Sequence, residues 1–253
     1  MRYALLLAAF FAVIMVHNAY SSYTVTHLNV TVQLNKNSSA SVNEVLTISL
    51  SNSSVQQYLT NRLALNLTLS TWQTLVGPML VQHIVNPVYG VYNFKFLPGA
   101  VFKNASGNYA YLLMSYNVAN VTSINQTGPR SFVYSFNTKV LNFEHGVSGE
   151  VLPSNTTFTI VLPPNAEIIS IYPIPDVPAS AFTTGYRNVT KISWIYGEPL
   201  SAFTLKFMVQ ESINTEVEAF FSGIYRFFGD SIYAIIALLI IAFIVYLYVR
   251  AGR

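Results

Sequence analysis

The residues of this chain best placed to undergo chemistry are asparagines that begin the triplet Asn-x-Ser/Thr. Such a triplet accepts an N-linked glycan when its middle residue is not proline, and it then belongs on an exported surface. Nine of the 21 asparagines qualify, which is more than the Ser and Thr content gives by chance. The sequence therefore predicts N-glycosylation candidates at Asn29, Asn37, Asn52, Asn66, Asn104, Asn120, Asn125, Asn155 and Asn188.

Side chains that usually carry catalysis or metals are scattered along the chain. His27, His83 and His145 are far apart, and His17 lies in the N-terminal apolar region. No two histidines have the His-x-x-x-His spacing of a helical metal site, and the absence of cysteine excludes a thiolate zinc site. No nucleophile elbow, phosphate-binding loop or dinucleotide fingerprint occurs. We therefore expect that the chain is not an enzyme and that it has no catalytic residue, no metal site and no cofactor.

Two acidic positions leave alternatives open. Glu144 and His145 are an acid–imidazole pair, but neighbours on a strand point to opposite faces, so a loop position is expected for them. Glu44 falls on the apolar face of a predicted strand, as either a buried, partnered acid or a residue at a sheet edge, and we expect the edge. Paired carboxylates for glycoside hydrolysis have no support from spacing.

Strands must position these residues. Apolar and polar residues alternate through residues 28–34, and the alternation resumes from Val42 to Leu50 after a polar turn, which predicts a hairpin with Asn29 facing away from the core. A short helix is expected at residues 55–63, with Ser54 as its N-cap. Further strands are expected at residues 91–96, 109–118, 131–136, 157–162, 167–172, 191–196 and 203–209. So many short strands predict a mainly β fold, an antiparallel β-sandwich.

Tyrosines on the predicted strands admit two interpretations. Tyr109 and Tyr111 share one face of their strand, and Ala110, Leu112 and Tyr116 share the other. If the second face forms the core, an exposed aromatic stripe remains, suited to protein or sugar contacts. Otherwise both faces pack inside the fold, which is the interpretation we expect.

Two apolar runs frame the predicted strands. The run at residues 4–16 follows Arg2 and precedes small residues, a pattern typical of a secretory signal cleaved after Ser21, with an uncleaved anchor as the alternative. The uncharged run at residues 232–249 spans about 27 Å as a helix, enough for one C-terminal transmembrane helix. Arg250 and Arg253 place the C-terminus in the cytoplasm.

These runs give the expected domain organisation. It comprises a signal peptide (1–21), an extracytoplasmic β-sandwich domain (22–210), a juxtamembrane amphipathic helix or linker (211–230), a transmembrane helix (231–249) and a cytoplasmic tail (250–253). Charged residues make up only 9% of the chain and form no basic patch, so a nucleic-acid partner is not expected. Dense sequons without cysteine favour an archaeal cell surface over a disulfide-rich animal ectodomain.

Two stretches carry a resemblance to known proteins. Residues 29–44, with Ser41-Val-Asn-Glu44 on the return strand, resemble the start of many prokaryotic membrane-anchored ectodomains. Residues 158–173, 192–194 and 203–207 are similar to the closing strands of archaeal membrane-anchored extracytoplasmic β-sandwich proteins. The resemblance implies the fold and an extracytoplasmic location, and it carries over no functional residue. Some such relatives have cytoplasmic DNA-binding domains, for which residues 250–253 offer no counterpart.

The sequence thus favours a single-pass, membrane-anchored cell-surface glycoprotein with a structural, adhesive or S-layer-contacting role. Its expected partners are the lipid bilayer and another surface protein, a membrane protein or an extracellular polymer. An alternative is an extracytoplasmic accessory subunit of a transport, respiratory or secretion complex. A surface hydrolase is a third hypothesis, which would require clustered acids.

Overall fold

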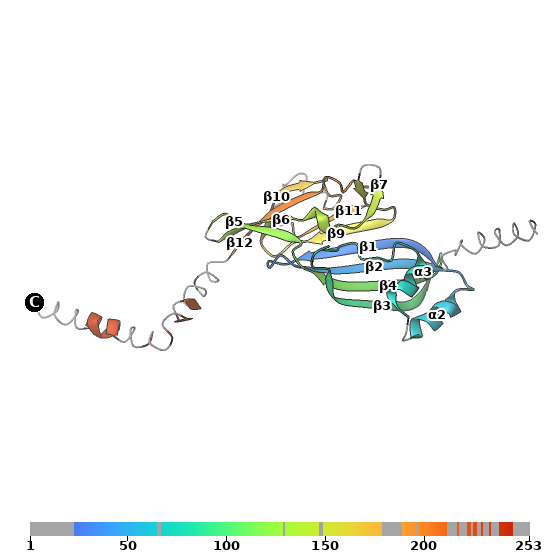
Figure 1. Cartoon of the computed structure of the whole chain (residues 1–253), viewed down its shortest axis with the longest axis horizontal. Coiled ribbons are helices and arrows are strands. Elements are labelled where there is room, and N and C mark those ends of the chain that lie inside the picture. Colours follow the sequence, from blue (N-terminus) through green and yellow to red (C-terminus); the bar gives the residue numbers. More distant parts are fainter. Residues whose placement is uncertain are drawn as a thin grey trace, which may run out of the picture. The chain divides into compact units, whose positions relative to one another are not determined.

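Figure 1 shows the computed structural model, which describes residues 23–64, 67–128, 130–146, 149–178, 189–195 and 197–211, and a few positions beyond them. The described chain is mainly β, as expected, with its strands in several sheets. The elements are β1 (Thr24–Leu34), β2 (Ala40–Leu50), α2 (Val55–Leu63), α3 (Leu69–Val76), β3 (Val91–Asn104), β4 (Gly107–Val118), β5 (Thr122–Gln126), β6 (Ser131–Phe136), η1 (Thr138–Val140), β7 (Glu144–Gly146), β8 (Gly149–Val151), β9 (Thr156–Val161), β10 (Ala166–Tyr172), β11 (Lys191–Ile195) and β12 (Thr204–Gln210).

The segments expected to export and anchor the chain fall largely outside these ranges. The predicted signal peptide (1–21) and tail (250–253) are not described, and neither is most of residues 211–230 and 231–249. Residues 238–244 of the predicted transmembrane segment are helical. No helix formed by described residues alone is long and apolar enough to cross a membrane.

The chain forms two compact units. The first comprises Met1–Asn125 and Val133–Val209, and the second comprises Gln126–Phe132 and Gln210–Arg253. In the second unit, the backbone N–H of Glu211 donates to the carbonyl oxygen of Arg130 at 2.9 Å. The sites described below belong to the first unit.

A six-stranded sheet, in the order β11-β9-β1-β2-β4-β3, is the largest element of the first unit (Figure 1). The predicted hairpin is confirmed, since β1 and β2 pair antiparallel and the N–H of Asn35 donates to the Ser39 carbonyl at 2.9 Å across the turn. On its other side β1 pairs with β9 in parallel, with Leu28 opposite Thr156. The hairpin therefore lies in the middle of the sheet, while β3 and β11 are its edges.

The other sheets are smaller, with orders β10-β12-β6-β5 and β7-β8. Phe203, which precedes β12 and is buried, lies where the two larger sheets meet. Its ring centroid is 5.4 Å from that of Phe136 on β6, 6.0 Å from Phe158 on β9 and 5.1 Å from Trp194 on β11. Aromatic packing at Phe203 thus joins the six-stranded sheet to the four-stranded one.

Helix α2 occupies the residues predicted for it, with Ser54 at the N-cap as expected, although the cap lacks its usual side-chain bond. Ser54 makes no capping bond with its side chain, which donates instead to the carbonyl oxygen of Ser51 at 3.0 Å. Helix α3 was not predicted. Thr68 caps it by accepting the N–H of Thr71, and Gly77 ends it with a φ of +105°.

Strand β3 is longer than the predicted 91–96, because it continues past Pro98 and Gly99 through two register shifts. Proline is tolerated there because β3 is an edge strand, which needs no ladder donor on its open side. Helix α2 lies beside this edge, where Tyr58 donates to the Gly99 carbonyl at 2.8 Å and Arg62 donates to the Pro98 carbonyl at 3.1 Å.

The remaining boundaries agree closely with the sequence. Strand β6 coincides with its prediction, and β4 begins two residues early. Strands β10 and β11 differ from their predictions by one residue at one end, and β9 and β12 by one residue at each end. Strands β5, β7 and β8 were not predicted, because each is short and has little apolar alternation.

Candidate functional site

Strict alternation along β2 and β4 gives the six-stranded sheet a buried face and an outer face. Ala110, Leu112 and Met114 of β4 are fully buried, whereas the residues between them point outward. Register fixes which outward residues are neighbours. Rows across β2, β4 and β3 are Ser41–Asn117–Tyr92, then Asn43–Ser115–Lys95, then Val45–Leu113–Leu97.

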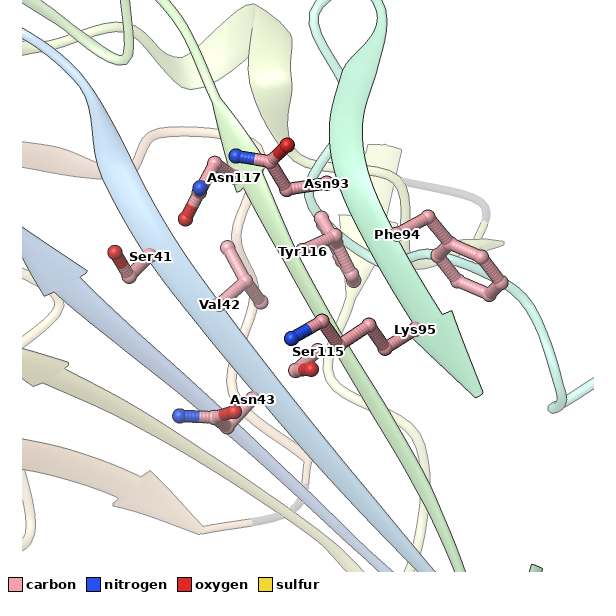
Figure 2. A pocket seen from close by; sticks show the side chains of 9 residues that line it. All are labelled: Ser41, Val42, Asn43, Asn93, Phe94, Lys95, Ser115, Tyr116 and Asn117. Atoms are coloured by element: carbon pink, nitrogen blue, oxygen red, sulfur yellow. The ribbon is translucent and has the colours of Figure 1, made fainter. Parts of the chain in front are cut away.

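The two polar rows border a shallow depression of about 430 Å³ (Figure 2). It lies over three adjacent strands, so the backbone beneath it is held by the sheet ladder. Figure 2 shows the Asn93 and Asn117 side chains at one end of the depression, while the ammonium group of Lys95 extends toward Ser115. The lining residues are Ser41, Val42, Asn43, Asn93, Phe94, Lys95, Ser115, Tyr116 and Asn117.

A bulge in β3 shapes this depression. Pairing between β3 and β4 is interrupted between Tyr92 and Lys95, and Asn93 adopts a φ of +55°. Asparagine is among the few residues that tolerate this left-handed conformation. The extra residues place Asn93 on the rim of the depression and Phe94 toward the Tyr116 ring, 6.3 Å away between centroids. Bulges commonly re-aim side chains beside functional sites.

Apart from Tyr116, whose hydroxyl bonds inside the core, the polar side chains of the depression make no side-chain hydrogen bond to any described residue. These are Ser41, Asn43, Asn93, Lys95, Ser115 and Asn117. Other asparagines of the first unit do use their amides, as Asn86 does toward the Ala119 carbonyl at 2.9 Å. Lys95 is the one charged residue in the lining. The depression therefore presents hydroxyl, amide and ammonium groups that are free to bind a ligand.

An apolar and aromatic strip continues the outer face beyond the polar rows. Leu97 is 63% exposed, Tyr111 42% and Leu113 38%. Phe102 stacks on Tyr111 at 4.7 Å and on Tyr109 at 5.9 Å between ring centroids. The exposed aromatic stripe, which was the less expected of the two interpretations of these tyrosines, is the one that the structure has.

Beneath the sheet, Glu44 is completely buried, so the expected edge position was wrong. Strand β2 lies between β1 and β4, and the carboxylate points into the core, where it accepts three hydrogen bonds. His83 donates from its backbone N–H at 2.8 Å and from its ring Nδ1 at 2.7 Å, and the Tyr116 hydroxyl donates to the same carboxylate. The acid is thus the buried, partnered one, with its partners 39 and 72 residues away in sequence.

This cluster is built as a structural anchor. Burial raises the pKa of Tyr116 far above its ordinary value, and the neighbouring Glu44 carboxylate raises it further. The phenol therefore stays a donor at physiological pH, and its oxygen in turn accepts the N–H of Ile84 at 3.2 Å. The Phe143 ring packs against the His83 imidazole at 5.2 Å. Glu44 thus fastens the connection between α3 and β3 to the inner face of the sheet.

The sequon asparagines are the second candidate site. Asn66 and Asn188 lie outside the described residues, and the other seven are all exposed. Among the ten described asparagines outside sequons, four are exposed, five are intermediate and Asn86 is buried. The exposed sequon residues are Asn29, Asn37, Asn52, Asn104, Asn120, Asn125 and Asn155. All the described sequon asparagines are therefore exposed, whereas fewer than half of the other described asparagines are.

Hydrogen bonding at four sequons leaves the amide nitrogen accessible. The side-chain oxygen accepts from Ser39 at Asn37, from Ser106 at Asn104 and from Asn108 at Asn52. The oxygen of Asn29 lies 3.1 Å from Nε2 of His27. The Nδ2 atoms of these four sequon residues, to which a glycan would attach, donate to no described residue. Asn35, Asn61 and Asn142, which are outside sequons, donate from Nδ2.

The other acids and histidines are brought together only in part. His145 on β7 pairs in register with Glu150 on β8, and burial raises the pKa of Glu150 while His145 lowers it. Glu144, expected in a loop, begins β7 and is exposed. Asp176 accepts the N–H of Ile195 at 2.8 Å. In the described ranges no group of three or more His, Asp or Glu side chains could hold a metal ion.

A second depression, of about 570 Å³, is lined by Asn120, Thr122, Ser123, Ser135, Phe136 and Asn137. It contains a sequon residue, Asn120, whose φ is +53°. A glycan on Asn120 would extend from this depression, so its space is less available to a separate ligand than that over β2, β4 and β3.

Comparisons with known proteins assign no family. No protein-family model matches the chain, and no curated protein matches it. A solved structure that it does match is the folded domain of LppM from Mycobacterium tuberculosis, determined by NMR. The identity is 9%, the match covers 77% of this chain and 93% of that domain, and the TM-score is 0.27. At this TM-score the likeness carries no argument about function.

Proposed function

We propose that this chain is a cell-surface glycoprotein with a structural or adhesive role. The observation that carries the proposal is the state of the sequons: all seven described sequon asparagines are exposed. At four of them the side-chain oxygen lies within hydrogen-bonding distance of a neighbour, while the glycan-accepting nitrogen donates to no described residue. Glycans occupy surface positions because their bulk and hydroxyl groups need solvent.

A β-sandwich is the fold proposed for the ectodomain. Its support is the buried packing of Phe203 with Phe158 and Trp194 of the six-stranded sheet and with Phe136 of the four-stranded one. Two sheets whose inner faces supply one apolar core are the basis of this architecture. The free outer face of the six-stranded sheet then becomes available for contacts with surroundings.

The proposed location rests on the sequence. Residues 1–21 would direct export, and residues 231–249 would hold the domain in the bilayer as a single-pass helix, with the C-terminus inside. An archaeal surface, where the partner is an S-layer or another extracellular polymer, is proposed from dense sequons without cysteine.

Glycopeptide mass spectrometry of native membranes tests this proposal. We expect glycan masses at several of the seven exposed sequon asparagines and no modification at the buried Asn86. Removal of residues 231–253 should move the protein from the membrane fraction to the soluble fraction. Seven unmodified sequons in protein isolated from its native membrane would remove the basis of the proposal.

A second candidate is an extracytoplasmic accessory subunit of a membrane complex. The observation that favours it is the apolar strip around Leu97, Tyr111 and Leu113, because exposed apolar patches often mark protein interfaces. Cross-linking after solubilisation in mild detergent separates the two candidates. An accessory subunit should co-migrate with polytopic partners, whereas a surface glycoprotein should not.

A further inference from the structure

The depression over β2, β4 and β3 has the composition of a binding site for a hydroxyl-rich ligand. Six polar side chains from three strands line it, and none of them has a side-chain partner among the described residues. Polar groups placed on a rigid sheet can be matched by a ligand with several donors and acceptors at little ordering cost. Saccharides are the common extracellular ligands with that chemistry.

We propose that this depression binds an acidic saccharide, with the Lys95 ammonium pairing with a carboxylate of the sugar. Of the described residues that line it, Lys95 is the one that is charged, and none is acidic. An ammonium that has no partner among the residues the structure describes favours an anionic ligand over a neutral one. The sugar hydroxyls then form hydrogen bonds with the amides of Asn43, Asn93 and Asn117 and with the hydroxyls of Ser41 and Ser115.

The size and flanks of the depression fit this ligand. Its volume of about 430 Å³ falls within the range of small-molecule sites, which is roughly 300–1,000 Å³. Tyr92, 44% exposed and in register with Asn117, adds an aromatic surface beside the polar rows. Because the depression is shallow, it contacts one side of a chain of sugars, as suits a polymer.

The saccharide has two possible sources. Asn29 lies on the same outer face, opposite Val45, while its neighbour Thr31 lies opposite Asn43 at the border of the depression. A glycan on Asn29 therefore begins one row away from the site and can fill it from the same molecule. The other source is a separate surface polymer. The first source rests on the proposed glycosylation, whereas the second does not.

The experiment uses the full chain in detergent, because binding needs no membrane. Isothermal titration with trigalacturonate as the probe, and maltotriose as the neutral comparison, measures the affinity of wild type, Lys95→Gln and Asn29→Gln. We expect trigalacturonate to bind and maltotriose to bind at least about threefold more weakly. We expect Lys95→Gln to weaken trigalacturonate binding by about three- to tenfold, as for an exposed charge-assisted pair.

Lys191→Gln is the matched control, since Lys191 is an exposed lysine on the opposite edge strand of the same sheet and does not line the depression. It should bind like wild type. Equal affinity in wild type and Asn29→Gln identifies an external saccharide, and binding that appears only in Asn29→Gln identifies the chain's own glycan. Both results support the site.

Two results overturn the inference. One is an absence of trigalacturonate binding in both wild type and Asn29→Gln at about 10 mM probe, a concentration that detects even millimolar dissociation constants. The other is an unchanged affinity in Lys95→Gln with an unchanged melting temperature. Neither result bears on the proposed glycoprotein function, which is tested separately by the masses of the glycopeptides.

Discussion

The carboxylate of Glu44 lies buried in the middle of the largest sheet, where an acidic group is costly to place. A carboxylate removed from water loses its hydration, and this loss is tolerated only where hydrogen bonds replace it. The backbone and ring of His83 and the hydroxyl of Tyr116 supply three such bonds. The cluster therefore joins two strands and a loop that no local sequence pattern connects.

Replacement of Glu44 by alanine should destabilise the protein by about 3–5 kcal/mol, because it leaves three buried donors without an acceptor. Glu44→Gln should cost less, since one acceptor oxygen remains. Urea denaturation followed by tryptophan fluorescence measures the free energy of unfolding. The control is Glu144→Ala, at an exposed carboxylate, which should change it by less than about 0.5 kcal/mol. Equal effects of the two alanine variants would contradict the anchoring role.

At the scale of elements, α2 and β3 are held together by a buried phenol. Tyr58 is fully buried and donates to the Gly99 carbonyl on β3, and its ring packs against Trp72 of α3 at 5.7 Å. Burial raises the pKa of Tyr58 to about 12, an effect that Arg62 opposes and Tyr23 reinforces. The contact between helix and strand thus depends on the protonated form of this side chain.

This pKa predicts a loss of stability at high pH. The unfolded chain releases the Tyr58 proton near pH 10, whereas the folded protein holds it to about pH 12. The folded state therefore binds more protons between these values, and the free energy of unfolding falls as the pH rises from about 10 to 12. Tyr58→Phe should make that fall shallower, while Tyr111→Phe, which removes an exposed phenol, should not. Denaturation curves at pH 9, 10 and 11 provide the measurement, and identical slopes in all three proteins would contradict it.

The approach of β3 to β4 depends on Gly99. A Cβ atom at this position would lie 2.9 Å from the backbone oxygen of Tyr111, so the strand would have to move. We expect Gly99→Ala to cost about 1–3 kcal/mol, visible as a lower melting temperature. Gly128→Ala is the comparison, because its Cβ would meet only the Ser131 side chain at an ordinary 3.6 Å. A melting temperature that falls no more in Gly99→Ala than in Gly128→Ala would show that β3 accommodates the methyl group.

Elements with strong local patterns were predictable from the sequence, and those that depend on distant contacts were not. The alternation in β1 and β2 fixed both strands and their turn within a few residues. Helix α3 was missed because it has eight residues, and Trp72 is buried by Tyr58 and Phe96 rather than by its own helix. Strand β3 was cut short at Pro98, which only an edge position permits.

The candidate sites also differ in how far the sequence predicts them. Sequons are local patterns, so the sequence named every candidate asparagine. The polar depression depends on the pairing of Asn43 with Ser115 and of Ser115 with Lys95, which residue spacing does not give. Polar residues at alternate positions of both β2 and β4 were its only signal. The prediction of an edge position for Glu44 was wrong because pairing between segments distant in sequence decides which strands lie on either side of β2.

At the scale of the whole first unit, Phe203 packs against aromatic rings of both larger sheets. We expect Phe203→Ala to destabilise the protein by about 3–5 kcal/mol, because the cavity removes contacts with Phe136, Phe158 and Trp194 together. Phe102→Ala, on the outer face, is the control and should cost less than half as much. The midpoint of urea denaturation measures both. If the two variants were equally stable, the sheets would not be joined at Phe203.

Because β1 pairs with β9 in parallel, β1 gains its two neighbouring strands at different times during synthesis of the chain. Strand β1 ends at Leu34, whereas its parallel partner β9 begins only at Thr156. During synthesis, which starts at the N-terminus, more than half of the chain must therefore be made before β1 has both of its neighbouring strands. Meanwhile β1, β2, β4 and β3 can pair among themselves, with one side of β1 open. Non-local pairing of this kind is slow and leaves an edge able to join other chains. Until β9 is made, β1 must therefore be kept from pairing with strands of other chains.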